Sequence, residues 1–338
     1  MAKIRGTGFF IPDIYCDDDF IERYGKRAEA ASKLIGHKTH YSATDIRTGK
    51  LKYSNTEMAE KAARNAIEDA GISINDIGMI IYSTCTPDYL LPPAYTFLQK
   101  RLGLRKCIGM DIRSGCAGFG TGLTIAETYI EAGKVENVLV VGCDLLSTRF
   151  SKLPVETLDL KSLFNYMFFG DGAGAVIVSK SKDKSIRYSE MFSDHAYVDM
   201  GSCFYVGGST NPYISEAVDK DKWGAYQASG LSEKYLSEVL IDTLRGIQDK
   251  IEVSLSKIDA FVMPVESEKI KERVLEELPE IQEQRICTSH EGGALINAAV
   301  PISLDIGIKN KLITTGKKVI IYAAENTQWQ HAVLYIEW

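Results

Sequence analysis

Short runs of apolar and β-branched residues recur along the chain, and polar stretches with helical periodicity separate them. Apolar runs without polar alternation are typical of strands that are covered on both faces of a sheet. Six such runs predict strands: residues 77–84, 137–143, 173–178, 258–265, 318–323 and 332–336.

The helical pattern is clearest in two segments between these runs. Residues 56–70 are one predicted helix, with Ser54 or Asn55 as its N-cap and Gly71 as its stop, and residues 232–251 are another. Strands that alternate with helices indicate a layered α/β fold.

Two patterns occur twice along the chain, in the same order. Residues 73–82 and 254–263 both carry a polar turn before an apolar run, and residues 114–118 and 289–293 both precede a helix, a glycine and a further apolar run. The alternative is that two unrelated helix-to-strand turns use the same common turn residues, which would give the same pattern without a repeat. If the repeat is real, two halves meet across a pseudo-two-fold axis and their glycine-containing loops face each other.

Composition narrows the class of protein. Of the 338 residues, 45% are hydrophobic and 25% are charged, which is typical of a globular protein of about two domains or two fused halves. A formal net charge of −6, without a long block of one sign, disfavours nucleic acids and anionic membranes as partners. The first residues form no apolar signal-peptide core and no run approaches about 20 apolar residues, so we expect a cytoplasmic protein outside the membrane.

The seven cysteines are scattered without a Cys-x-x-Cys pair, so we predict neither a disulfide framework nor a metal site. Cys116 stands just before a predicted apolar helix, residues 121–132. Unpaired N–H groups and the helix dipole favour a thiolate there, and the Cys116 N–H is a candidate oxyanion donor. The alternative is a buried structural cysteine, which is common for free thiols.

Three segments, in this order, resemble the β-ketoacyl-acyl-carrier-protein synthase III family of the thiolase-like fold. They are residues 111–120 around Cys116, residues 138–144 and the glycine-rich residues 168–175. The resemblance implies an α/β, five-layered αβαβα fold built from two similar halves. Residues 1–180 would form the half with the nucleophilic cysteine, and residues 181–338 the half with a candidate histidine.

The resemblance also implies a chemistry. Cys116 matches the cysteine that takes an acyl group from an acyl-CoA or an acyl carrier protein, so coenzyme A or a phosphopantetheine thioester is expected as substrate and no cofactor as permanently bound. A homodimer is usual in the family. Leu91, with Leu90 beside it, matches the region that often closes the acyl pocket of the partner subunit.

The family pattern breaks in the second half of the chain. Condensing enzymes of the family use a histidine and an asparagine there. Val265 and Glu268 stand at the histidine and asparagine positions of one family motif, and Ala294 stands at the asparagine position of a second motif. His290, just upstream, is therefore a candidate base or oxyanion donor for Cys116, and the alternative is a surface or capping histidine. Glu266 is a candidate partner that orients His290, or else a solvated acid before a helix.

Two further segments depart from the pattern. A Gly-Gly-Gly-Phe run of the family is replaced by residues 323–329, so that Glu325 and Asn326 add side chains near the site. Asn326 is a candidate oxyanion donor or an ordinary turn residue. His37 and His40 match an exposed segment near the coenzyme A entrance, and with nearby basic residues they either meet phosphates or form a solvated basic loop.

Three functions remain open from the sequence. The first is a synthase III-like acyltransferase, in fatty acid or secondary metabolite biosynthesis, that condenses the acyl-cysteine with a malonyl-type thioester. The second passes the acyl group to an alcohol or amine without decarboxylation, which needs one base and no enolate donors. The third is a catalytically silent partner subunit, although the presence of Cys116 at a helix start argues against it.

Overall fold

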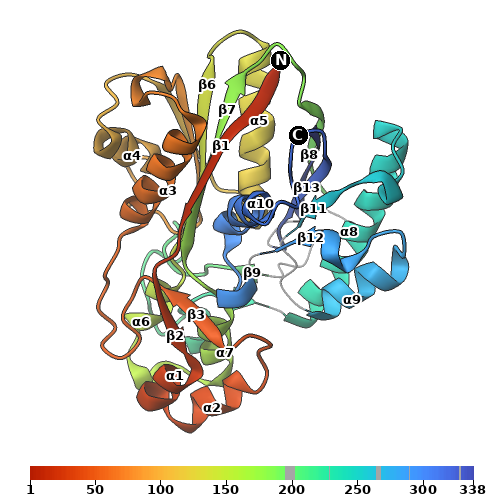
Figure 1. Cartoon of the computed structure of the whole chain (residues 1–338). Coiled ribbons are helices and arrows are strands. Elements are labelled where there is room, and N and C mark those ends of the chain that lie inside the picture. Colours follow the sequence, from red (N-terminus) through yellow and green to blue (C-terminus); the bar gives the residue numbers. More distant parts are fainter. Residues whose placement is uncertain (195–201, 228, 264–267, 289, 327–328) are drawn as a thin grey trace.

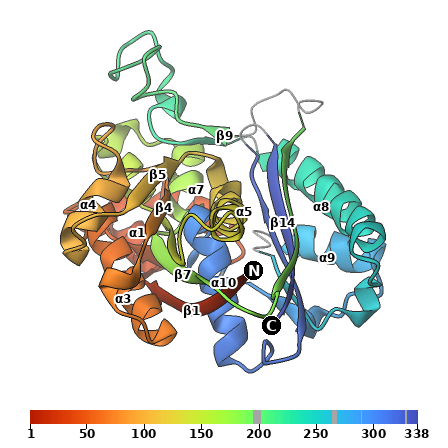
Figure 2. The same cartoon turned by 90° about the horizontal axis from the view of Figure 1, so that it is seen from above.

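Two five-stranded sheets and three layers of helices make up the computed structural model, which describes residues 1–194, 202–227, 229–263, 268–288, 290–326 and 329–338 (Figure 1). Viewed from above, α3 and α4 lie outside the first sheet, α5 and α10 between the sheets, and α8 and α9 outside the second sheet (Figure 2). The predicted five-layered αβαβα fold is therefore confirmed. The helices of these layers are α3 (Asn55–Ala70), α4 (Ala94–Leu102), α5 (Gly118–Glu131), α8 (Ser229–Ile251), α9 (Glu268–Glu277) and α10 (Ala299–Lys309).

The two sheets have the same strand order and the same strand directions. In each sheet the first two neighbouring pairs are antiparallel and the last two are parallel. The first sheet runs β1 (Ala2–Phe10), β7 (Gly172–Lys180), β6 (Asn137–Asp144), β4 (Met79–Ser83) and β5 (Ile108–Ile112). The second runs β8 (Ile186–Ser193), β14 (Gln330–Glu337), β13 (Lys318–Ala324), β11 (Ala260–Val262) and β12 (Ile286–Cys287).

The remaining elements form a lobe below the first sheet in the view of Figure 1 and a short excursion beside it. The lobe contains β2 (Asp13–Cys16), α1 (Asp17–Tyr24), α2 (Lys26–Ser32), β3 (Thr39–Ser42), α6 (Ser147–Ser151) and α7 (Leu160–Phe168). The excursion contains β9 (Ser202–Cys203) and β10 (Tyr226–Gln227).

Local sequence explains where the elements begin and end. Ser54 caps α3: its side chain accepts a hydrogen bond from the Glu57 N–H, and the Glu57 carboxylate accepts one from the Ser54 N–H. Gly71 ends α3 in the left-handed conformation, with φ of 60°.

All six predicted strands are present, although β11 is shorter than predicted, and α5 begins three residues before the predicted helix. The strand β1 was not predicted, because two glycines interrupt its short apolar pattern.

The core lies where the sheets face each other across α5 and α10. Apolar residues of both sheets and both helices form one continuous cluster there.

None of the helices within the described ranges is long and apolar enough to span a bilayer.

A buried histidine in β14 makes the stability of the fold depend on pH. His331 is 1% exposed. Its Nδ1 lies 2.7 Å from the Tyr322 hydroxyl, and its ring stacks on Phe192. Burial lowers the pKa of His331 from 6.5 to about 4, against a smaller opposite effect of Asp194. Between these two pKa values the unfolded chain binds the proton and the folded chain does not, so folding stability falls as the pH falls.

We expect the free energy of unfolding to decrease by about 3 kcal/mol between pH 6.5 and pH 4 through His331 alone. Urea unfolding at several pH values measures this, and His331→Phe, which keeps the stacking on Phe192, should flatten that part of the curve. An unchanged slope in His331→Phe would assign the pH dependence to other groups.

Candidate active site

Cys116 lies in η2 (Gly115–Ala117), a short 3₁₀ turn that leads directly into α5. The thiol is partly buried. The first turn of α5, all of which is described, carries no acidic residue. The turn packs against the end of β13, against β14 and against η8 (Ile296–Ala298), so it lies where the two halves of the chain meet.

A buried asparagine that the sequence analysis missed joins the two halves beside this turn. Asn297 is fully buried, and its Oδ1 accepts a hydrogen bond from the Ser83 hydroxyl at 2.6 Å. Its Nδ2 donates to Asp144 Oδ2 at 2.8 Å, and the Cys85 sulfur lies 3.7 Å from the same nitrogen. The first half thus holds η8 of the second half through polar contacts inside the core.

Asp144 is the centre of this network. Its Oδ1 accepts from the backbone N–H groups of Cys85 at 2.7 Å and Thr86 at 3.1 Å, and its Oδ2 accepts from the Asn297 side chain. Burial raises the pKa of Asp144, and the hydrogen bond from Asn297 is the largest effect in the opposite direction. With both oxygens engaged, Asp144 is suited to fix the geometry of the site rather than to move protons.

The backbone before Asn297 is strained. Ile296 has a φ of 49°, in the left-handed region that β-branched residues avoid. Such a conformation persists only where surrounding contacts fix it. The bonds of Asn297 to Ser83 and Asp144 are such contacts. One polar residue, Asn297, within the otherwise apolar residues 294–302 was the sequence signal for this network.

The residues after β13 bring a carboxylate to the same turn. Glu325 is 1% exposed, its Oε1 accepts from the Gln330 N–H at 2.8 Å, and its side chain packs over Gly115. Asn326 follows it and is also buried. Burial raises the pKa of the Cys85 thiol well above its ordinary value, and the negative charges of Asp144 and Glu325 raise it further. Cys85 is therefore a neutral thiol.

Several of the other predicted site residues lie wholly or partly outside the described part of the structure. The backbone of His290 begins η7 (His290–Gly292), where the Thr39 hydroxyl of β3 donates to the Glu291 carbonyl oxygen, but its side chain is outside the described part. Val265 and Glu266 also lie outside the described residues. Ala294 is buried, and its backbone bonds to the loop that ends α7.

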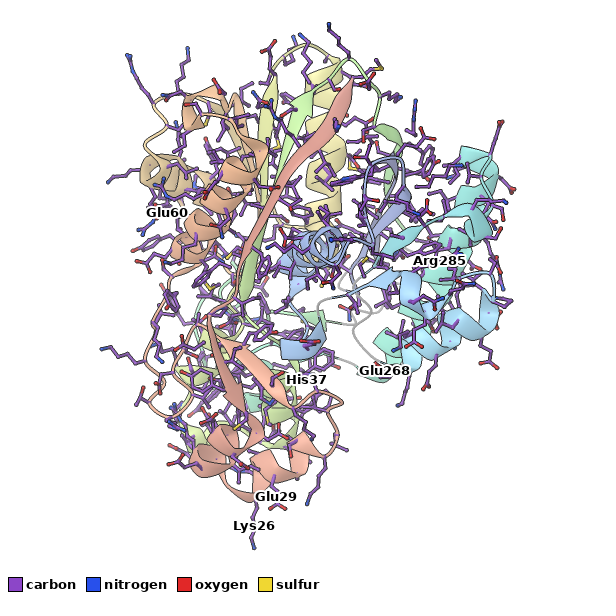
Figure 3. The ribbon with its side chains drawn as sticks, in the orientation of Figure 1. Lys26, Glu29, His37, Glu60, Glu268 and Arg285 are labelled. Carbon is purple, nitrogen blue, oxygen red and sulfur yellow. The ribbon has the colours of Figure 1, made fainter. Side chains whose placement is uncertain are left out.

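The interpretation of the segment around His37 and His40 as exposed is wrong for His40. His40 is buried, and its two ring nitrogens lie 2.9 Å from the Met167 carbonyl oxygen and 2.8 Å from Asp17. Lys38 also pairs with Asp17, so its charge is balanced locally. His37 lies at the edge of the lower lobe, and Glu268 lies at the start of α9 (Figure 3).

Exposed apolar side chains gather in the loop between β4 and α4. Leu90 and Leu91 are 71% and 80% exposed. The loop leads into the start of α4, where Asp111 of β5 accepts hydrogen bonds from the Ala94 and Tyr95 N–H groups. In the described part of the chain, β5 pairs only with β4 and forms the edge of the first sheet.

Sequence comparison decides the family. The sequence profile of 3-oxoacyl-[acyl-carrier-protein (ACP)] synthase III matches residues 110–195, which include Cys116. The β-ketoacyl-[acyl-carrier-protein] synthase III of Neisseria gonorrhoeae (strain NCCP11945) is 30% identical over 329 residues, which cover 95% of this chain and 94% of the relative. The chain belongs to the β-ketoacyl-acyl-carrier-protein synthase III family.

Solved structures of condensing enzymes share the fold of this family member. The tetronic acid condensing enzyme AbyA1 has a TM-score of 0.88 at 19% identity, with complete coverage of both chains. The 3-oxoacyl-[acyl-carrier-protein] synthase III of Aquifex aeolicus VF5 has a TM-score of 0.81 at 24% identity, and the match covers 99% of this chain and 100% of that one. The fold of the chain is thus that of synthase III enzymes.

Proposed function

We propose that this protein transfers an acyl group through a thioester on Cys116. The observation that carries the proposal is the position of Cys116 in η2, a partly buried turn that leads into the N-terminus of α5. Backbone N–H groups at such a position support a thiolate and an oxyanion. The acyl donor is an acyl-CoA or an acyl carrier protein thioester, which enters as substrate and leaves as the free thiol.

Two acceptors are candidates for the second step. Family membership favours a malonyl-type thioester, whose decarboxylation gives the carbon nucleophile. Transfer to an alcohol or amine is favoured by Ala294, a buried apolar side chain where the family has an asparagine that holds the enolate oxygen. In either reaction, His290 is the proposed base or oxyanion donor, Glu266 the residue that orients it, and Asn326 a second oxyanion donor.

The deciding experiment starts from enzyme that has been acylated and freed of excess donor. Malonyl-CoA is added in one arm and a panel of alcohols and amines in the other, and released CO2 and the new ester or amide are measured. CO2 release coupled to loss of the acyl group supports condensation, whereas ester or amide formation supports the second acceptor. An acylated enzyme that reacts with neither contradicts both, and absence of acylation leaves the silent partner subunit.

We also propose a homodimer in which β5 and the loop of Leu90 and Leu91 meet a second copy. The support is the unpaired edge of β5 next to strongly exposed leucines.

Leu91→Glu is expected to weaken this dimer at least tenfold, because a buried, unpaired carboxylate opposes association. Sedimentation velocity over a concentration series measures the effect. Leu34→Glu changes a leucine that is 65% exposed in the turn after α2 and should leave the dimer intact. A wild-type protein that stays monomeric at tens of micromolar would contradict the proposal.

A further inference from the structure

Glu325 is the acidic side chain that lies directly against the turn of the nucleophile. A Cβ atom placed on Gly115 would lie 2.8 Å from Glu325 Oε2 and 2.8 Å from Glu325 Cβ. Gly115, which directly precedes Cys116, has a φ of 49° that favours glycine, and its missing side chain leaves room for the carboxylate.

The position of Glu325 is fixed from the other side. Its backbone N–H donates to the Gln330 carbonyl oxygen at 3.0 Å, and its Oε1 accepts from the Gln330 N–H at 2.8 Å. One carboxylate oxygen therefore anchors the side chain across the connection between β13 and β14. The other oxygen, Oε2, is the one beside Gly115.

Two other ionisable side chains near the site are unsuited to accept the proton. Asp144 is held on both oxygens by the loop after β4 and by Asn297, so it is not available for proton transfer. Cys85 is a buried neutral thiol whose pKa Glu325 itself helps to raise. Arg113 acts on Cys85 in the opposite direction, and it is the one cation among the main influences on that thiol.

We propose that Glu325 is the catalytic base of the second half-reaction and that the acceptor is therefore an uncharged hydroxyl or amino compound. This inference rests on the proposed function, because it requires the acyl group on Cys116. A malonyl thioester would bring a second carboxylate to a buried carboxylate, and two like charges in a site of low dielectric repel each other. An O–H or N–H acceptor needs a proton acceptor instead, which Glu325 supplies.

Transfer to the acceptor moves one proton and breaks the thioester. The acceptor oxygen or nitrogen bonds to the acyl carbon while its proton passes to Glu325. The bond between the acyl carbon and the Cys116 sulfur breaks, and the electron pair stays on sulfur. Glu325 then returns the proton to the Cys116 thiolate, so that the ester or amide leaves and the free enzyme is restored.

Single-turnover kinetics of the acylated enzyme test the proposal. Each variant is acylated with an excess of acyl-CoA, separated from the donor and mixed with the alcohol or the amine panel. In Glu325→Gln, the amide oxygen can still accept from the Gln330 N–H, so the turn is preserved. We expect acyl transfer to slow by about 10² to 10⁴-fold, while acylation of Cys116 changes by less than about tenfold.

The pH profile separates a base from a structural role. Transfer by the wild type should fall at acidic pH as the base is protonated, and Glu325→Gln should lose this acid limb. Glu325→Ala opens space beside Gly115, and added formate should restore part of its rate. Glu337→Gln, which removes a carboxylate paired with Arg187 far along β14, should behave as wild type.

Three outcomes would overturn the inference. One is Glu325→Gln with a wild-type transfer rate and an unchanged acid limb. Another is an acid limb that disappears in His290→Ala and persists in Glu325→Gln, which would make His290 the base. The third is rapid CO2 release from malonyl-CoA by the acylated wild type without ester or amide formation. In all three, Cys116 is still acylated; failure of acylation would instead remove the proposed function and the inference together.

Discussion

Cys116→Ala should abolish the mass gain that the wild-type protein shows after incubation with an acyl thioester. Without the thiolate there is no atom to hold the acyl group between the two substrates. Turnover should fall by at least about 10³-fold, as expected for loss of a nucleophile. Intact-mass spectrometry with a panel of acyl-CoA donors measures acylation, and release of free coenzyme A measures the first half-reaction.

Two other cysteines serve as matched controls for this variant. Cys16 has an exposed thiol, and Cys16→Ala should keep the full mass gain. Cys85 lies near the site, but burial and neighbouring carboxylates raise its pKa, so Cys85→Ala should also remain acylated. A mass gain that survives in Cys116→Ala and disappears in either control would move the acyl group to another sulfur and contradict the assignment.

Gly142→Ala is expected to destabilise the protein by about 3 kcal/mol or more, as overpacking against rigid backbone does. A Cβ atom at this position of β6 would lie 2.0 Å from the carbonyl oxygen of Asn297 and 3.1 Å from the Phe119 ring. The backbone carbonyl cannot rotate away as a side chain could, so η8 would have to leave its place on β6. Urea unfolding followed by circular dichroism measures the loss.

The same variant should also lose acyl transfer, because the movement of η8 would break the bonds between Asn297 and Asp144 beside the turn of Cys116. Gly246→Ala is the control: it lies inside α8 with no atom within 4 Å of the added Cβ, and alanine should stabilise the helix by about 0.5 to 1 kcal/mol. Equal stability of Gly142→Ala and wild type would mean that β6 and η8 are not packed as described.

Buried polar groups lie beside the turn of Cys116. The network of Ser83, Asn297 and Asp144 ties η8 to the first sheet. A neutral amide between a hydroxyl and a buried carboxylate satisfies all three groups, which is the condition for burying polar atoms without loss of stability.

Local patterns in the sequence determined most of the framework. The strands β4, β6, β7, β13 and β14 are continuous apolar runs, and the ends of α3 follow from Ser54 and Gly71. The position of Cys116 before α5 follows from the apolar helix that the sequence predicts a few residues after it. These features depend on neighbours in the chain, and for that reason they could be predicted. The strand β1 was not predicted because two glycines interrupt its apolar pattern and because its burial comes from α3 and β7, which lie far away in the sequence.

The sequence by itself determined the layered α/β fold, the repeated order of elements and the cysteine at a helix start. Only the tertiary structure decided which polar side chains surround that cysteine. Asn297 and Glu325 are more than 150 residues from Gly115 along the chain, and they reach its surroundings because the two sheets pack on the same pair of helices. Contacts of this kind are set by the packing of whole layers, and no local spacing in the sequence encodes them.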